Sequence, residues 1–118
     1  EVYYQKMFAD KILDELNSID YIVTYIGTGT LAKSLISLAK GSQVQVVGVI
    51  EKGRELKPTI KKMDLQIHEL EFDRVIDYKE SIENTHNINI GIISSMSLIV
   101  AEEISKQTNK RVFTFITD

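Results

Sequence analysis

Two glycines and two threonines, Gly27-Thr28-Gly29-Thr30, form the stretch of this sequence that best fits ligand chemistry. Glycine has no Cβ atom, so the backbone can turn sharply at Gly27 and Gly29 and approach a ligand closely. An apolar run over residues 21–26 precedes the glycines, and apolar residues at helical spacing follow them. The free N–H groups and the dipole of such a helix favour an anion, most often a phosphate, and the threonine hydroxyls can add hydrogen bonds or cap the helix. A tight turn without a ligand is the alternative.

A second junction of similar layout lies further along the chain. An apolar run over residues 88–93 comes before Ser94 and Ser95, and apolar residues at helical spacing follow. Serine is a common N-cap, so we expect the two hydroxyls at the same end of the sheet as the glycine turn, as caps or as part of the site. The spacing does not support a catalytic triad of either serine with His86 and an aspartate. His68 has no clustered partner and is expected at the surface rather than on a metal.

These junctions require strands and helices that hold them at one edge of a sheet. Residues 21–26 and 44–50 are apolar on both faces, as is typical of buried parallel strands. Gly41, between them, suits the left-handed position that follows a helix. The result is a strand–helix–strand unit, which builds a parallel sheet through a right-handed crossover. Ligands of such sheets bind beyond the carboxyl ends of the strands, where the glycine turn is expected.

The remaining segments extend the same alternation. In chain order we expect an amphipathic helix over residues 1–17, a loop with a short helix over 51–71, an edge strand over 72–78, a helical turn over 79–84, a polar turn over 85–87, a strand over 88–93, a helix that begins at Ser94-Ser95, a turn at Asn109-Lys110 and a last strand over 112–116. This order predicts an α/β fold, a three-layer α/β/α sandwich with a mostly parallel, Rossmann-like sheet.

Composition bounds the possible functions. The 118 residues, 43% of them hydrophobic, suffice for one domain with a real core. The net charge of −3, with acids and bases interspersed, argues against a nucleic-acid surface. The absence of cysteine excludes a disulfide framework, a thiolate nucleophile and a cysteine metal site. There is no apolar run of membrane-spanning length and no signal peptide, so we expect a cytoplasmic protein without a membrane partner. Because the chain starts with Glu1, we expect it to be a segment of a longer protein.

Five segments, taken in order, resemble the large domain of the cysteine synthase and cystathionine β-synthase group of fold-type II pyridoxal-phosphate enzymes. YYQKMFADKILDELNSIDYIVTYIGTGT resembles that family's helix, aspartate, apolar strand and GTGGT phosphate loop. VQVVGVI is similar to its VVGVE-type strand, and FDRVIDYKESI to its I-D-E-V-I-x-V-x-D-E-E-A-I segment. INIGIISSMSLIVAEEI resembles its V-G-I-S-S-G-A-A helix, and VFTFITD its last core strand. The resemblance covers nearly the whole chain, and its strength lies in the order of the segments.

The resemblance implies pyridoxal phosphate as the cofactor, and β-replacement on a serine-type amino acid as the reaction of the complete enzyme. It also implies a set of cofactor-binding residues: Gly27, Thr28, Gly29 and Thr30 at the phosphate, Gly91, Ser94 and Ser95 along the same edge, and Thr117 or Asp118 beside the pyridine nitrogen. No metal is implied. A small amino acid would be the substrate, and a homodimer or a separate second half would complete the protein.

The chain also departs from the family pattern. Thr30 stands where the GTGGT loop has a glycine, and a β-branched residue disfavours positive φ. Met96 replaces the glycine of Ser-Ser-Gly, and residues 51–71 replace a longer glycine-rich loop. The lysine that carries the cofactor in this family, and the Ser-Gly-Asn substrate loop, have no match here. We therefore expect no catalytic residue, and no complete β-replacement activity, in this chain alone.

Two other functions stay open at this point. Loss of loop glycines favours a non-catalytic interaction domain that has kept the fold. A nucleotide- or phosphate-binding kinase-like module is the other, because DYIVTYIGTGTL also resembles the Gly-Gly-Asp-Gly-Thr loop of nicotinamide-dinucleotide kinases. Thr28 stands where that kinase family needs an aspartate, and the later segments match it less well.

Overall fold

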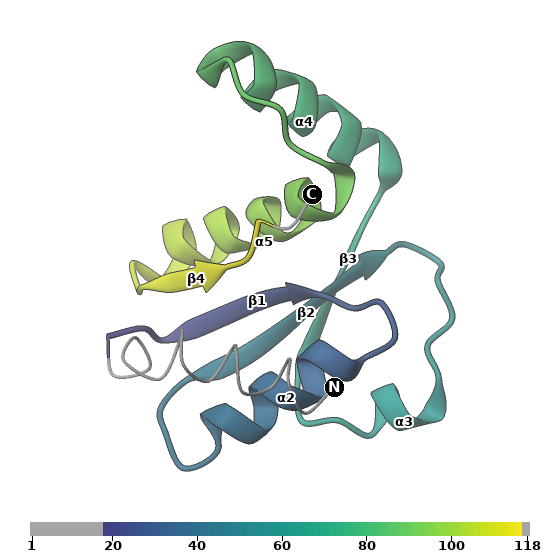
Figure 1. Ribbon diagram of the computed structural model, residues 1–118, viewed down its shortest axis with the longest axis vertical. Coiled ribbons are helices and arrows are strands. Elements are labelled where there is room, and N and C mark those ends of the chain that lie inside the picture. The colour runs from purple at the N-terminus through teal and green to yellow at the C-terminus, as the bar shows by residue number, and fades with distance from the viewer. Residues whose placement is uncertain (1–17, 117–118) are drawn as a thin grey trace.

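The computed structural model describes residues 18–116 and places helices on both faces of a four-stranded sheet (Figure 1). The strands are β1 (Tyr21–Tyr25), β2 (Gln45–Glu51), β3 (Gln66–Leu70) and β4 (Val112–Thr114). The helices are α2 (Thr30–Ala39), α3 (Pro58–Lys61), α4 (Phe72–His86) and α5 (Ile92–Thr108). All pairings are parallel, which confirms the predicted three-layer α/β fold. The helix expected over residues 1–17, and the site residues Thr117 and Asp118, lie outside the described residues.

The predicted strand–helix–strand unit is present. β1 and β2 pair in parallel, with Tyr21 opposite Gln45 and Tyr25 opposite Val49. α2 connects them, and Gly41 follows this helix with a left-handed φ of +84°, which suits glycine. The parallel pairing therefore places the carboxyl ends of β1 and β2 at the same edge of the sheet.

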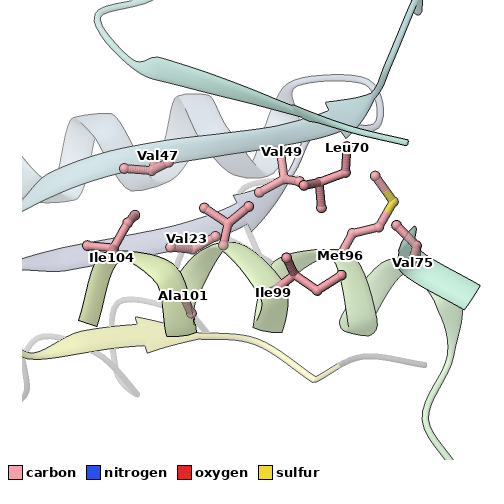
Figure 2. Packing of buried hydrophobic residues seen from close by; sticks show 10 residues of the cluster. Val23, Val47, Val49, Leu70, Val75, Met96, Ile99, Ala101 and Ile104 are labelled. Atoms are coloured by element: carbon pink, nitrogen blue, oxygen red, sulfur yellow. The ribbon is translucent and has the colours of Figure 1, made fainter. Parts of the chain in front are cut away.

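One face of the sheet carries the main core (Figure 2). Val23, Val47 and Val49 of the central strands face the buried side of α5. Met96, near the start of α5, lies in the same cluster as Leu70, the last residue of β3, and Val75 of α4. Removal of this much apolar surface from water is the main force that holds α4 and α5 on the sheet.

The opposite face is covered by α2 and α3 (Figure 1). Ile22 and Val46 of the sheet pack with Leu35 of α2. Ile60 of the short helix α3 belongs to a further cluster with Ile26, the residue just before the glycine turn. Both faces of the central strands are thus buried, which explains their nearly continuous apolar sequence.

The prediction of a strand over residues 72–78 is wrong, because this segment is the first half of α4. Phe72, Val75 and Tyr78 recur every three residues, which fits helical spacing and not the alternation of a strand, and only Val75 of the three is fully buried. The edge strand of the sheet lies earlier, at β3, inside the segment expected to be a loop with a short helix. The short helix itself is present as α3. The turn expected over 79–84 is part of α4, as are Thr85 and His86, and Asn87 alone ends the helix with a φ of +52°.

The prediction of a strand over residues 88–93 is also wrong. This segment is irregular up to Gly91, which is the N-cap of α5. Ile88 and Ile93 are exposed and Ile90 is buried, so the apolar run does not mark a central strand. Ser94 and Ser95 lie within the helix rather than at its N-cap position.

The turn predicted after α5 is confirmed, since Asn109 ends the helix in a left-handed conformation with a φ of +54°. The last strand is shorter than the predicted 112–116 and comprises Val112–Thr114. It pairs with β1, and the hydroxyl of Thr114 donates a hydrogen bond of 2.8 Å to the carbonyl of Val23.

The strand order β3-β2-β1-β4 reverses at β1. β1 is followed by α2 on one face of the sheet, whereas β4 is preceded by α5 on the other face (Figure 1). Such a reversal is where open α/β sheets bind ligands, outside the carboxyl ends of the strands. The glycine turn directly follows β1 and therefore lies at this position.

Candidate functional site

The turn between β1 and α2 is built on one left-handed glycine. Gly29 has a φ of +94° and is the N-cap of α2, and its carbonyl accepts a hydrogen bond of 3.0 Å from the N–H of Lys33. A Cβ atom at Gly29 would stand 3.0 Å from Cγ1 of Ile60. Glycine is therefore required at position 29 for conformation and for space.

Gly27, unlike Gly29, is not required by the backbone conformation of the turn. Its φ is not in the left-handed region, and a Cβ atom there would meet nothing within 4 Å. Glycine at position 27 is thus not needed for the fold. Because it has no side chain, the backbone of the turn is accessible to a ligand. Thr30 takes the first helical position of α2, so its β-branched side chain causes no backbone strain.

The two threonines of the turn hydrogen-bond to each other. The hydroxyls of Thr28 and Thr30 lie 3.1 Å apart, and Oγ1 of Thr28 also accepts the N–H of Thr30 at 3.4 Å. Both residues are exposed. The Thr28 oxygen thus adds a hydrogen bond at the start of α2, whereas the N-cap residue itself is Gly29, which has no side chain to cap the helix.

Several backbone donors of the turn are left without a protein partner. Among residues 18–116, the N–H groups of Gly27, Thr28 and Gly29 reach no acceptor. The first N–H groups of α2 are also outside the helical ladder, as in any α-helix. This end of α2 can therefore receive an anion by hydrogen bonds and by the helix dipole.

Sequence reasoning missed a second group of residues at the turn. The guanidinium of Arg54 donates hydrogen bonds to the carbonyls of Ile26 and Gly27, the latter at 2.5 Å. The same side chain lies 5.7 Å from the ring centroid of Tyr25 and 3.7 Å from Oε1 of Glu51. Parallel pairing of β1 with β2 brings these residues together, so the only signal in the sequence was that Glu51 and Arg54 stand at and just after the end of the strand next to the turn.

Tyr25 and Glu51 form the base of this group. The hydroxyl of Tyr25 donates a hydrogen bond of 2.8 Å to Oε1 of Glu51. Burial and this hydrogen bond raise the pKa of Tyr25 above its usual value of 10.0, and the nearby Arg54 opposes them. The phenol therefore stays protonated at neutral pH and keeps donating to the carboxylate.

The first turn of α5 lies at the same edge of the sheet, on the opposite face from α2 (Figure 1). Gly91 is partly exposed there, whereas Ser94 and Ser95 are fully buried. The hydroxyl of Ser95 donates a hydrogen bond of 2.7 Å to the carbonyl of Gly91. The structure thus brings the two predicted junctions to one edge, but it places the two serine hydroxyls inside the protein.

The chain leading into α5 is fixed by Glu83 of α4. One carboxylate oxygen accepts the N–H of Ile90 at 3.0 Å, and the other lies 2.9 Å from Nζ of Lys79. The Ile90 hydrogen bond and the Lys79 ion pair lower the pKa of Glu83. Glu83 therefore positions Gly91, which follows Ile90 directly.

The other candidate residues do not gather into a site. His86 is exposed at the end of α4, away from the buried position of the serines. His68 lies on β3 and is half buried rather than at the surface, and burial lowers its pKa. Within the described part of the chain, no three acidic or histidine side chains are arranged to hold a metal ion. Across residues 18–116, no helix has the length and apolarity needed to cross a membrane.

A cavity of about 840 Å³ is found elsewhere, beside the second half of α2 and the first residues of β2 and β3. Its lining includes Lys33, Lys40 and Asp64 but no residue of the glycine turn. The turn is instead an open feature of the surface, at the edge where strand order reverses.

Comparison with known proteins gives a likeness in fold. No family model and no curated protein matches the sequence. Among solved structures, an O-acetylserine-dependent cystathionine β-synthase from Helicobacter pylori matches with a TM-score of 0.81 and 17% identity, over 98% of this chain and 45% of that one. An O-ureido-L-serine synthase gives 0.78 and 16%, over 99% and 45%. An O-acetylserine sulfhydrylase isoform 3 from Entamoeba histolytica gives 0.74 and 17%, over 94% and 41%.

These solved structures are enzymes of the group that the sequence resembles. The present chain spans less than half the length of each of the three. At this level of identity the likeness concerns the fold, and the chain has the fold of one large portion of the cysteine synthase and cystathionine β-synthase type of structure.

Proposed function

We propose that this chain is the phosphate-binding portion of the large domain of a pyridoxal-phosphate enzyme of the cysteine synthase type. The observation that carries the proposal is the turn from Gly27 to Thr30, whose unpaired N–H groups lie where the strand order reverses. The likeness in fold to enzymes that handle serine-type amino acids supports it.

The residues of the turn fit a phosphate group. The open space beside Gly27 admits a ligand close to the backbone, and Gly29 provides the left-handed conformation from which α2 begins. In this proposal Gly27, Thr28, Gly29 and Thr30 hold the phosphate. When bound, the cofactor supplies the electron sink for chemistry on an amino-acid substrate, while the protein binds and orients it.

The second junction and the chain end complete the proposed cofactor site. Gly91, Ser94 and Ser95 are proposed to line it from α5, and Thr117 from the segment after β4. Since both serine hydroxyls are buried, the first turn of α5 would contribute through its backbone. Glu83 would support this wall through its hydrogen bond to Ile90.

The chain alone is proposed to be catalytically incomplete, because it has no counterpart of the cofactor-bearing lysine. Three isoleucines at the start of α5 are between 37% and 48% exposed: Ile88 shortly before the helix, and Ile92 and Ile93 in its first turn. We propose that a second half, or a second copy in a homodimer, covers this surface. Sedimentation should then show self-association of the isolated chain that an Ile92→Ser/Ile93→Ser variant reduces, and a clean monomer would contradict the proposal.

An amide-resolved NMR titration of the 118-residue chain tests the proposed ligand. The probes are inorganic phosphate, pyridoxine 5′-phosphate, pyridoxal phosphate and ATP. Pyridoxine 5′-phosphate has no aldehyde and cannot condense with surface lysines, so it reports the phosphate site alone. We expect amide shifts at residues 27–31 with both pyridoxine 5′-phosphate and pyridoxal phosphate. Additional shifts near Gly91 are expected only with probes that carry the pyridine ring.

Gly27→Val is the matched variant for this titration. A Cβ atom at position 27 would meet nothing within 4 Å, so we expect the variant to fold, yet its side chain would occupy the space through which a phosphate would approach. Loss of the shifts in a folded Gly27→Val chain supports the proposal. Shifts with ATP alone would favour the kinase-like module, and the absence of shifts with any probe would favour an interaction domain that has kept the fold.

A further inference from the structure

We propose that Arg54 is a positioning residue of the glycine turn, which orients two backbone N–H groups toward the ligand side. This inference rests on the proposed function, because the ligand concerned is the phosphate. Its basis is a pair of contacts: one guanidinium nitrogen donates to the carbonyl of Ile26, and the other donates to the carbonyl of Gly27 at 2.5 Å. A single fork-shaped side chain thus holds two successive peptide units.

The planarity of the peptide bond determines what this hold achieves. In a trans peptide the C=O of one residue and the N–H of the next point in opposite directions. With the carbonyl of Ile26 turned to Arg54, the N–H of Gly27 points away from it, and the carbonyl of Gly27 fixes the N–H of Thr28 in the same manner. These are two of the donors that reach no acceptor among residues 18–116.

Arg54 is itself held from two sides. Its Nη1 lies 3.7 Å from Oε1 of Glu51 and 3.4 Å from the hydroxyl of Tyr25, whose ring the guanidinium overlies at 5.7 Å. Its side chain is 28% exposed, whereas that of Lys52, two residues earlier, is 64% exposed. Tyr25 and Glu51 lie near the ends of paired strands, so the sheet fixes the position of this group.

The charge of Arg54 acts in the same direction as its geometry. A cationic donor polarises the carbonyls that it binds, and the attached N–H groups become stronger donors. Lysine carries the same charge but lacks the planar fork that bridges two carbonyls. The role assigned to Arg54 is therefore specific to arginine.

The test compares Arg54→Gln and Arg54→Lys with Lys52→Gln in the 118-residue chain. Lys52→Gln removes the same charge from the same loop, but its ammonium pairs with Glu71, 2.9 Å away, and not with the turn. The first readout is the set of amide shifts and hydrogen-exchange rates of Gly27 and Thr28 without ligand. The second is the affinity for inorganic phosphate, with the thermal midpoint as the check on global folding.

We expect Arg54→Gln to move the Gly27 and Thr28 amides and to weaken phosphate binding by at least about tenfold, at a thermal midpoint close to that of Lys52→Gln. Arg54→Lys should recover only part of the affinity. Equal effects of Arg54→Gln and Lys52→Gln, or full affinity in Arg54→Lys, would overturn the inference, since charge alone would then suffice. If wild-type chain binds no phosphate while Arg54→Gln still moves the two amides, the positioning role stands and the proposed function fails.

Discussion

Gly29 and Ile60 face each other closely: a Cβ atom on Gly29 would stand 3.0 Å from Cγ1 and 3.2 Å from Cδ1 of Ile60. Ile60 is buried in the four-residue helix α3, which follows β2 and not β1. A segment about thirty positions later in the chain therefore packs against the glycine turn. The conformation of the turn depends on this contact as well as on its own glycines.

Gly29→Ala should destabilise the chain markedly, whereas Gly27→Ala should not. The left-handed φ of +94° costs an L-residue about 1–2 kcal/mol, and the contact with Ile60 adds to that cost. At position 27 neither penalty applies, and a change within about 0.5 kcal/mol is expected. Urea unfolding midpoints measure both. Equal losses in the two variants would show that the turn has another conformation in solution.

Gly48→Ala should destabilise the sheet by overpacking rather than by backbone strain. A Cβ atom at position 48, in the centre of β2, would lie 2.8 Å from Cδ1 of Leu65 and 2.9 Å from Cδ1 of Ile26. Such overpacking costs about 1–3 kcal/mol. Because Ile26 directly precedes the glycine turn, the variant should also move the amide of Gly27 in NMR spectra.

The double variant Gly48→Ala/Leu65→Ala separates the two sources of this clash. Leu65→Ala removes the nearest of the overlapping atoms, so the combined loss of unfolding free energy should be smaller than the sum of the single losses. Strict additivity would mean that Leu65 moves aside without cost.

Glu83→Gln should weaken the segment that leads into α5, and the effect should depend on pH. The pKa of Glu83 is lowered from its ordinary value of 4.5, so its ionised form contributes stability that is present above that value and is lost as the pH falls through the folded-state pKa. The stability difference between wild type and Glu83→Gln should therefore be largest near neutral pH and vanish in acid. Thermal unfolding between pH 7 and pH 3 measures it.

Glu80→Gln is the matched control for this experiment. Glu80 lies one turn earlier on α4 and is exposed. Its variant should show little change in stability at either end of the pH range. A Glu83→Gln effect that is the same at every pH would mean that the carboxylate does not accept the Ile90 hydrogen bond as a charged group.

The sequence was sufficient to predict the central strands, which are covered on both faces of the sheet. Apart from Gln45, residues 21–26 and 44–50 are buried or half-buried, so their apolar runs carry an unambiguous signal, and the glycine turn between them follows from local chemistry. β3 gave no such signal, because Gln66 and Glu69 on this edge strand are exposed and its five residues include only one that is fully buried. An edge strand with one partner does not need an apolar sequence.

The two wrongly predicted strands, over residues 72–78 and 88–93, share one cause: each contains apolar residues that are not buried in the described part of the chain. Phe72 is 57% exposed and Ile88 is 48% exposed, so the patterns of residues 72–78 and 88–93 do not report packing within the described chain. Arg54 could not have been found from local pattern either. Its acceptors, Ile26 and Gly27, are 28 and 27 positions away, and only the parallel register brings them near.

The ionisation of the Tyr25 phenol should depend on Glu51, which accepts its hydrogen bond. The pKa of Tyr25 is raised above 10.0, first by burial and then by Glu51, so the folded state keeps this proton longer than the unfolded state does. Stability from this group is complete below pH 10 and is lost as the pH rises through the folded-state pKa. Glu51→Gln should lower the pKa of Tyr25, because a neutral amide replaces the carboxylate that opposes phenol ionisation.

A carbon-13 NMR titration of the tyrosine rings resolves this change, and Glu102→Gln serves as its mirror control. Glu102 accepts the hydroxyl of Tyr78 at 2.8 Å and raises the pKa of that phenol, with burial as the larger cause. Each variant should therefore lower the pKa of its own tyrosine and leave the other unchanged. If Glu51→Gln leaves Tyr25 unaltered, the contact between them is absent in solution, and the support that it gives to Arg54 and the glycine turn is absent with it.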